Sequence, residues 1–452
     1  MSSTAEETTE QLQERIQALV SEGDLERVGE LVEELHPSDL ADVVERLEVG
    51  DQVALLSAIP VELASEALAE MEEGEERGHL LAALEPGKGA ELIEELADDD
   101  AADLMGELEP PEQQKILDVL SDETAGELIG LLQYDEETAG GLMTTDLVAV
   151  EGTLTAADAL VQVRTQGREV EDFYTVFVVD ARRRLLGTLR LDDLVIAEPA
   201  TRIEELVEEP VATVGPGEDQ EHVGRLIARY NLASLPVVGP GGALLGRITF
   251  DDVIDVIEAE QTEDIFRLAG VNDDHELRNS WRASVRTRLP WLLLNLGTAA
   301  GAASVIIVFE DVIAQVLTLA FLAPIIAALG GSTGTQSLAI TIRRITVEGS
   351  GSARGFVLRE IVIGVVIGGV LGLGIAALAV LKDGNPMLGL VVMLAMWGNQ
   401  IVAGFAGAFV PATLDRLGVD PSVASSVFVH TLTDLCGFFL LLGLASRLLL
   451  AG

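Results

Sequence analysis

Cysteine and lysine are almost absent from this 452-residue chain. The single cysteine, Cys436, excludes an internal disulfide and any metal site built from clustered cysteines. Lysine occurs only at Lys88, Lys115 and Lys382, whereas aspartate and glutamate number 75, and the formal net charge is −47. Such a chain repels nucleic acid and attracts cations, so we expect no nucleic-acid partner. A salt-adapted host is a competing explanation for much of this charge.

Signals of secretion and of catalysis are also missing. The N-terminus, MSSTAEETTE, is polar and acidic and lacks the apolar core of a signal peptide, so the soluble part is expected in the cytosol. The sequence shows no nucleophile–base set, no phosphate loop and no His/Cys cluster. We therefore expect a protein that is not an enzyme.

The acidic residues are concentrated in one part of the chain. Residues 1–275 carry 66 acidic and 17 basic side chains, whereas the rest carries 9 and 11. The sequence thus predicts a strongly anionic soluble body followed by a nearly neutral, apolar half.

Residues 1–133 repeat a short unit. An apolar anchor returns about every twelve residues, and each unit opens with Pro, Ser or Asp before helical spacing begins. The anchors are Leu35, Leu47, Ile59, Met71, Leu84, Leu96, Leu108, Leu120 and Leu132. This periodicity predicts a superhelix of short helices. Asp99 and Asp103 lie one turn apart on one of these helices. They are interpreted either as part of a solvated face or as a pair that binds a cation.

Residues 134–200 and 201–259 show the same order twice: strand, helix, apolar strand, turn, strand ending in Leu-Asp-Asp or Phe-Asp-Asp, helix. This order resembles a tandem pair of CBS domains, which are regulatory α+β modules. The last helix continues into a connecting segment, residues 253–280. Its crowded carboxylates indicate a solvated linker or a segment neutralised by divalent cations.

The apolar half contains five predicted membrane spans, about 291–309, 312–336, 356–381, 386–413 and 421–450. Arginines gather before span one and between spans two and three, which predicts that these segments are cytosolic. Five spans then place the C-terminus outside the cell membrane.

Span five carries a carboxylate, Asp434, in the middle of an apolar run. A charge at the bilayer centre costs about 2.5–3.5 kcal/mol or more, so its retention indicates a use. Either Asp434 meets a cation in a pore, or it is a structural acid that faces a neighbouring helix. His430, one turn earlier, is a candidate partner.

Two other membrane segments are unusual. Span two contains Pro324, Gly330, Gly331 and Gly334, which predict either an interrupted helix beside a wet cavity or a close helix crossing. Span four contains the polar step Trp397–Gln400, which could face the interior of the bundle.

Taken together, the chain resembles the MgtE family of magnesium channels over essentially its full length. The motifs that carry the resemblance are Asp135–Thr144, Pro324–Gln336, Gly418–Pro421 and Thr431–Phe439. The expected fold is multidomain: an all-α superhelical N domain (1–133), an α+β tandem CBS pair (134–200 and 201–259), a connecting "plug" helix (253–280, overlapping the second module) and an all-α transmembrane domain of five helices (281–452).

The resemblance implies a homodimer with the pore on its two-fold axis, lined by spans two and five, and the pore carboxylate at Asp434. It also implies regulatory Mg²⁺ between the N domain, CBS pair and plug helix, and leaves ATP open as a CBS ligand. The implied regulatory acids are Asp99, Asp103, Asp219, Glu221, Asp252, Asp255, Glu260, Glu263, Asp264 and Asp420. Two positions depart from the family pattern: Ser332 replaces an asparagine of span two, and Asn231 replaces an acidic CBS residue.

The sequence therefore predicts a Mg²⁺ channel of the cell membrane, closed by cytosolic Mg²⁺. A CBS-regulated transporter of Co²⁺, Mn²⁺ or another solute is the alternative, and a membrane-anchored nucleotide sensor without transport is a third possibility.

Overall fold

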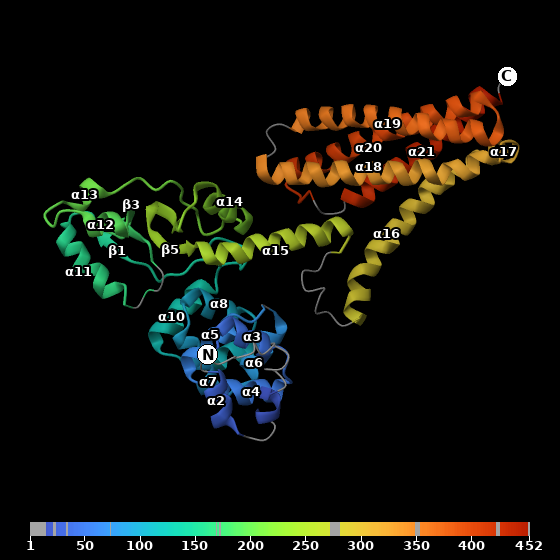
Figure 1. Ribbon diagram of the computed structural model, residues 1–452. Coiled ribbons are helices and arrows are strands. Elements are labelled where there is room, and N and C mark those ends of the chain that lie inside the picture. Colours follow the sequence, from blue (N-terminus) through green and yellow to red (C-terminus); the bar gives the residue numbers. More distant parts are fainter. Residues whose placement is uncertain are drawn as a thin grey trace, which may run out of the picture. The chain divides into compact units, whose positions relative to one another are not determined.

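The structure, a computed structural model, comprises two compact units, Met1–Glu258 and Ala259–Gly452, which are described separately (Figure 1). It describes residues 15–20, 24–32, 35–72, 74–168, 170, 173–271, 281–348, 353–421 and 425–450.

The first unit begins with an array of short helices. Each packs mainly on the helix two places along the chain, α3 on α5, α5 on α7, α4 on α6 and α6 on α8, which produces a two-row superhelix as predicted. The helices are α2 (Leu25–Val32), α3 (Pro37–Val44), α4 (Val49–Ala58), α5 (Val61–Ala69), α6 (Glu75–Ala83), α7 (Pro86–Glu95), α8 (Asp98–Gly106), α9 (Pro110–Leu117) and α10 (Asp122–Leu131).

The apolar anchors lie where these helices end. Ile59, Leu84 and Leu96 are the residues that directly follow α4, α6 and α7. Ile59 and Leu84 are buried, and Leu96 packs against the same core. The twelve-residue period therefore reflects one helix plus one turn, with the anchor folded back onto the stack.

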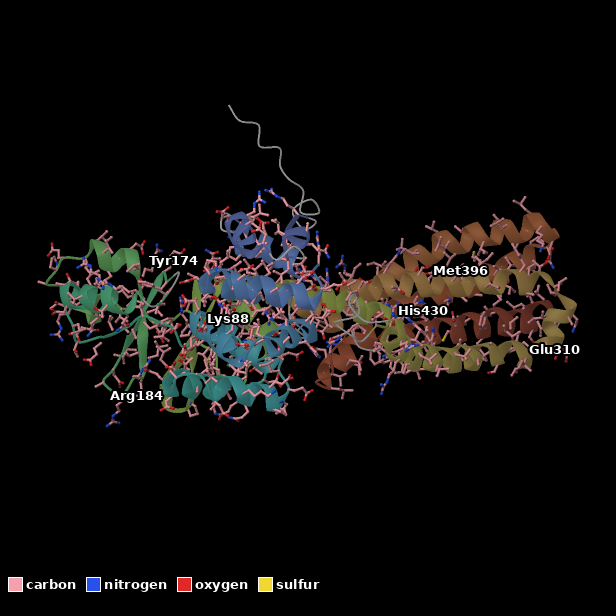
Figure 2. The ribbon with its side chains drawn as sticks, turned by 90° about the horizontal axis from the view of Figure 1, so that it is seen from below. Lys88, Tyr174, Arg184, Glu310, Met396 and His430 are labelled. Atoms are coloured by element: carbon pink, nitrogen blue, oxygen red, sulfur yellow. The ribbon has the colours of Figure 1, made fainter. Side chains whose placement is uncertain are left out.

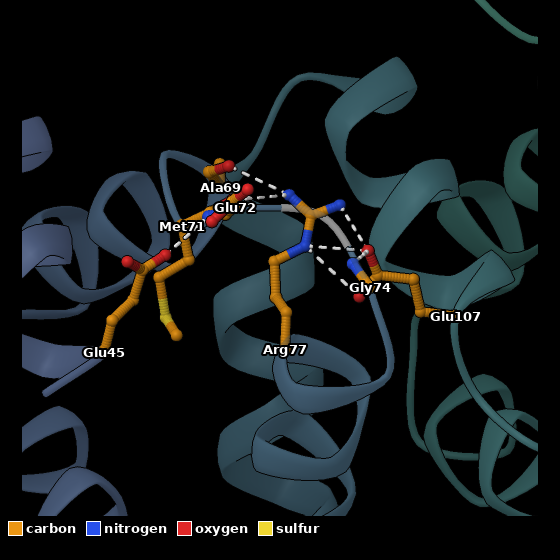
Figure 3. Close-up of polar contacts among 7 residues, drawn as sticks. All are labelled: Glu45, Ala69, Met71, Glu72, Gly74, Arg77 and Glu107. Atoms are coloured by element: carbon orange, nitrogen blue, oxygen red, sulfur yellow. Dashed lines mark hydrogen bonds and ion pairs between the residues drawn. The ribbon is translucent and has the colours of Figure 1, made fainter. Parts of the chain in front are cut away.

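A buried ion pair ties the middle of the array together (Figure 3). Arg77 of α6 is 4% exposed, and its guanidinium lies 2.8 Å from a carboxylate oxygen of Glu107, just beyond α8. Arg77 also donates to the carbonyl of Ala69, and Glu107 accepts from the backbone N–H of Gly74. Both charges are thus satisfied within the protein, which a buried pair requires.

The two CBS modules repeat the predicted order. In the first, β1 (Ala149–Glu151) pairs in parallel with β2 (Thr175–Val179), which pairs antiparallel with β3 (Leu185–Arg190). In the second, β4 (Ser234–Val238) pairs antiparallel with β5 (Leu244–Thr249), and a parallel bridge from Val214 to Val237 stands where the first module has β1. Their helices are α11 (Ala156–Gln166), α12 (Leu191–Ile196), α13 (Ile203–Leu206) and α14 (Gln220–Tyr230), with the 3₁₀ turn η1 (Pro240–Gly242).

The connecting helix is α15 (Phe250–Ala269), which starts directly after β5. The remainder of the predicted plug segment, residues 272–280, lies outside the described residues.

Five helices of the second unit are long and apolar enough to cross a membrane, which agrees with the predicted number among the described residues. They are α16 (Trp281–Val308), α18 (Thr318–Glu348), α19 (Ala353–Asp383), α20 (Pro386–Arg416) and α21 (Ser425–Leu449), and the short α17 (Glu310–Gln315) precedes α18. In Figure 1, α18 to α21 run side by side as a bundle.

The glycine-rich part of span two is helical throughout. The structure favours the close crossing over the interrupted helix, because α18 continues from Thr318 through Pro324 to Glu348. A methyl group on Gly331 would lie 2.9 Å from the His430 ring, and one on Gly334 would lie 2.5 Å from Val429. The glycines thus let α21 approach, and α18 extends about a dozen residues beyond the predicted end of the span.

Candidate functional site

A cavity of about 770 Å³ opens beside the predicted pore residue, within the membrane unit. Its wall is formed by α18 and α21, with one residue each from α16 and α17. The lining residues are Ile306, Ile313, Ala320, Ala323, Pro324, Ala327, Ala328, Gly331, Ser332, Thr335, His430, Asp434 and Phe438. The lining is apolar apart from Ser332, Thr335, His430 and Asp434, so a carboxylate there meets few competing polar groups.

Asp434 is half-buried on α21 and faces this cavity. No ion pair joins it to a basic side chain in the part of the chain that the structure describes. Among those residues, moreover, no three His, Cys, Asp or Glu side chains lie close enough to hold a metal ion together. One chain therefore offers a single carboxylate to a cation here, which is too few ligands for a closed metal site.

The neighbours of Asp434 in the cavity have partners of their own. The His430 ring (labelled in Figure 2) donates from Nδ1 to the carbonyl oxygen of Ser426 at 2.9 Å, rather than to Asp434 as suggested from the sequence. Ser332 donates to the carbonyl of Ala328 one turn back on α18. A serine hydroxyl bound in this way extends less far into the cavity than an asparagine amide at the same position would.

The polar step of span four does face the bundle interior. Asn399 and Gln400 are both fully buried on α20, and the Trp397 indole donates to the carbonyl of Val365 on α19. Asn399 donates to the carbonyl of Ile326 on α18.

A second membrane carboxylate, Glu360, was missed in the sequence reading. It lies on α19, is 4% exposed and accepts a hydrogen bond of 2.7 Å from the buried hydroxyl of Ser337 on α18. The reasoning that singled out Asp434 also applies to this acid, because it too lies inside an apolar span. The hydrogen bond from Ser337 indicates that Glu360 joins α19 to α18, and Glu360 is not among the cavity-lining residues.

In the first unit the structure brings together α8 and the start of α15. One carboxylate oxygen of Asp99 is buried without a hydrogen-bond partner among the described residues. Burial, followed by repulsion from Asp252 and the flanking acids, raises the pKa of Asp99 well above its ordinary value. Desolvation and then Asp252 also raise the pKa of Asp100 to about 6. Burial likewise raises the pKa of Asp252, which accepts from the Thr249 hydroxyl.

Neighbouring residues explain why these acids stay together. Asp98 accepts hydrogen bonds from the Thr144 hydroxyl and from the backbone N–H of Thr145, and this joins α8 to the start of the first CBS module. Asp103 is half-buried one turn beyond Asp99 on the same helix. The sequence identified Asp99 and Asp103 but not the supporting Asp98, whose role depends on contacts 46 residues away.

Three CBS positions have local structural roles. Asp219 caps α14 by accepting from the backbone N–H of Glu221 at 2.9 Å, and Glu221 forms an ion pair with Arg225. Asn231 ends the same helix in the left-handed conformation, with φ of 52°, which asparagine adopts more readily than most residues. These contacts neither require nor test a metal at Asp219 or Glu221.

The acids of α15 fall into two groups. Asp252 and Asp255 belong to the first unit, whereas Glu260, Glu263 and Asp264 belong to the second. One acid of the second group is paired with an arginine of the same helix. Arg267 forms an ion pair with Glu263 and another with Asp420, the residue before Pro421. Arg267 was not singled out from the sequence, because its partner Asp420 is 153 residues away.

Comparison with known proteins gives consistent matches along the chain. The family model for the divalent cation transporter MgtE matches residues 323–444, that for the MgtE intracellular N domain matches residues 35–137, and that for the CBS domain matches residues 139–199 and 203–259. The magnesium transporter MgtE of Thermus thermophilus is 36% identical over 97% of this chain and 99% of its own. That of Bacillus subtilis is 31% identical over 97% and 98%.

Two solved structures resemble the soluble part. The soluble part of a magnesium transporter is 31% identical with a TM-score of 0.51, and covers 56% of this chain and 99% of its own. The cytosolic domain of the Mg²⁺ channel MgtE in complex with ATP is 37% identical with a TM-score of 0.51, and covers 54% and 99%.

Proposed function

The chain belongs to the MgtE family of magnesium transporters, and from this premise we propose that it conducts Mg²⁺ across the cell membrane through the cavity at Asp434. The observation that carries this proposal is the position of Asp434: a carboxylate half-buried in a membrane helix faces a cavity and forms no salt bridge with a lysine or arginine among the described residues. A buried acid of this kind is compensated when a cation passes.

The dimensions of the cavity fit a hydrated ion. Mg²⁺ keeps an octahedral shell of six waters and sheds it reluctantly. Six waters at about 30 Å³ each occupy roughly 180 Å³, which is well below the cavity volume of about 770 Å³. The carboxylate can thus hold the ion through its water shell, and the weak outer contact lets the ion leave again.

We propose that the working unit is a homodimer in which each chain supplies one Asp434. The support is the single carboxylate that one chain brings to the cavity, together with the absence of a three-ligand group among the described residues. From the arginine distribution and the five spans we also propose that the soluble unit lies in the cytosol and the C-terminus outside.

The pore assignment is tested by flux. In proteoliposomes, Asp434→Asn keeps the shape of the side chain and removes its charge, so Mg²⁺ uptake is expected to fall at least tenfold. The matched control is Glu360→Gln, an equally conservative change at a membrane acid that is not among the cavity-lining residues. Mg²⁺ uptake that survives Asp434→Asn unchanged refutes the pore site. Uptake of Co²⁺ or Mn²⁺ without Mg²⁺ would favour the alternative substrate.

Cytosolic Mg²⁺ is the proposed regulator. Asp99, Asp100 and Asp252 form a cluster of carboxylates whose ionised forms repel one another, and a divalent cation removes this repulsion. Ions bound between α8, the CBS pair and α15 therefore stabilise the closed form, and their differential affinity for that form sets the threshold.

The regulatory proposal is tested at the far end of α15. Neutralising Glu260, Glu263 and Asp264 together is expected to leave the channel open at Mg²⁺ concentrations that close the unaltered protein. The measurement is open fraction against Mg²⁺ on the side of the soluble unit. Normal closure of the triple variant would show that these acids are salt adaptation only.

The CBS pair is the proposed site of an adenine nucleotide. Its support is the similarity to the cytosolic domain of the Mg²⁺ channel MgtE in complex with ATP. Titration of the full chain with ATP by calorimetry tests this assignment, and the absence of heat at millimolar ATP would contradict it.

A further inference from the structure

Asn399 lies fully buried at the point where α20 meets both helices of the cavity wall. Its Nδ2 group donates a hydrogen bond of 3.0 Å to the carbonyl of Ile326 on α18. A polar side chain on α20 thus reaches across to a helix that lines the ion path, although Asn399 itself does not line the cavity.

Two glycines make room for this carboxamide. A methyl group on Gly330 of α18 would overlap the Asn399 amide nitrogen, and one on Gly437 of α21 would lie 3.0 Å from the same nitrogen. Real Cβ atoms are essentially never found at the first distance, and the second is tighter than nine in ten real Cβ contacts, so an alanine at either position would push the Asn399 amide from its place. The amide therefore fills the space between α18 and α21.

Gly330 and Gly437 are both next to cavity-lining residues along the chain. Gly330 adjoins Gly331, which lines the cavity, and Gly437 follows the cavity residue Asp434 by three positions and precedes Phe438. A change in the distance between Gly330 and Gly437 consequently shifts α18 relative to α21, the helix that carries Asp434.

Stability does not explain the choice of asparagine here. The amide oxygen of Asn399 is buried and has no hydrogen-bond partner among the described residues. An unsatisfied buried acceptor opposes folding, and an apolar side chain of similar size would avoid that cost. The carboxamide is better explained by the spacing and the cross-helix bond that it provides.

We propose that Asn399 is a positioning residue for ion passage: its carboxamide holds α18 and α21 at a fixed separation and so sets the width of the path at Asp434. The inference rests on the proposed function of the cavity and extends it to the helix behind the wall. Removal of the carboxamide lets the two helices approach, and the path becomes narrower. A narrower path disfavours Mg²⁺, which dehydrates reluctantly, relative to Ca²⁺.

The chain offers a matched control in the next residue. Gln400 is also a fully buried amide on α20, but its Cβ packs on Gly368 of α19 and its Nε2 lies 3.6 Å from the Met396 sulfur. In proteoliposomes, Asn399→Ala is expected to raise the ratio of Ca²⁺ to Mg²⁺ uptake at least fivefold, whereas Gln400→Ala changes it less than twofold. The ratio does not depend on how much protein is correctly folded, so a loss of stability alone leaves it unchanged.

Compensation provides a second and independent test. Gly330→Ala alone is expected to disrupt transport, because its methyl group overlaps the Asn399 amide. In the Asn399→Ala background the methyl group enters the vacated space, so Gly330→Ala is expected to restore the ion ratio to within twofold of the unaltered protein.

Three outcomes would overturn the proposal: an unchanged ratio in Asn399→Ala, an equal change in Gln400→Ala, or no compensation in the double variant. The unaltered protein decides the proposed function separately, through its own Mg²⁺ flux. If it carries another divalent cation instead, the ratio is taken against that ion and the test of Asn399 stands.

Discussion

Acidifying the face that carries the soluble unit is expected to close the channel even when Mg²⁺ is absent. The reason lies in the carboxylates of α8 that face Asp252. Desolvation and Asp252 raise the pKa of Asp100 to about 6, and the pKa of Asp99 is also raised. Protons can therefore remove the same repulsion that we assign to bound Mg²⁺.

The sign and size of the effect follow from linkage between proton binding and conformation. A carboxyl with a raised pKa in the compact form stabilises that form fully below its ordinary pKa, and this stabilisation is lost as the pH rises through about 6. If separation of α8 from α15 restores an ordinary pKa of about 3.9, Asp100 alone shifts the closed-to-open ratio about tenfold between pH 7 and pH 5, or ~1.4 kcal/mol. Asp99 adds to this in the same direction.

The measurement is open fraction in excised patches without Mg²⁺, with the soluble unit facing a bath stepped from pH 7 to pH 5. Asp100→Asn should remove most of the pH response, and this separates Asp100 from histidines that titrate in the same range. Asp42→Asn, an exposed acid on α3, is the matched control and should keep the response. An open fraction that does not change with pH, or a full response in Asp100→Asn, would refute the carboxylate-repulsion account of gating.

Two further predictions concern two arginines that form ion pairs with carboxylates. Arg77→Ala leaves Glu107 buried without its cation and is expected to destabilise the N-terminal array by about 3–5 kcal/mol, whereas Arg77→Lys should cost less. The measurement is the thermal unfolding of the full chain, and an equal melting temperature of Arg77→Ala and the unaltered protein would contradict the stabilising role of the buried pair. Arg267→Gln removes the cation between Glu263 and Asp420 and is expected to raise the open fraction at low Mg²⁺ by up to about fivefold, which is the effect of losing a partly exposed ion pair. Arg267→Lys should gate almost like the unaltered protein. If Arg267→Gln gates normally, these contacts do not stabilise the closed form.

The sequence was most informative where one local pattern has one structural solution. The twelve-residue period of Leu84 and Leu96 could be satisfied only by stacked short helices, because each unit buries its apolar face on its neighbours. The strand–helix–strand order, repeated twice, predicted both CBS modules, and five apolar runs predicted five membrane helices. The cost of a charge in lipid drew attention to Asp434, although the same cost applies to Glu360, which the sequence reading missed.

Other features depended on packing between distant segments, which no local pattern encodes. Gly330, Gly331 and Gly334 fit a broken helix or a close crossing equally well until Asn399 and the His430 ring were seen against them. The raised pKa of Asp99 arises from burial and from Asp252, and the pairing of Arg267 with Asp420 joins α15 to the segment before α21. Periodicity determined the elements, because burial of apolar surface follows from the order of residues along one helix or strand. Only the tertiary structure decided which charges and amides meet, because electrostatic and hydrogen-bond energies depend on distance in space, whatever the separation in sequence.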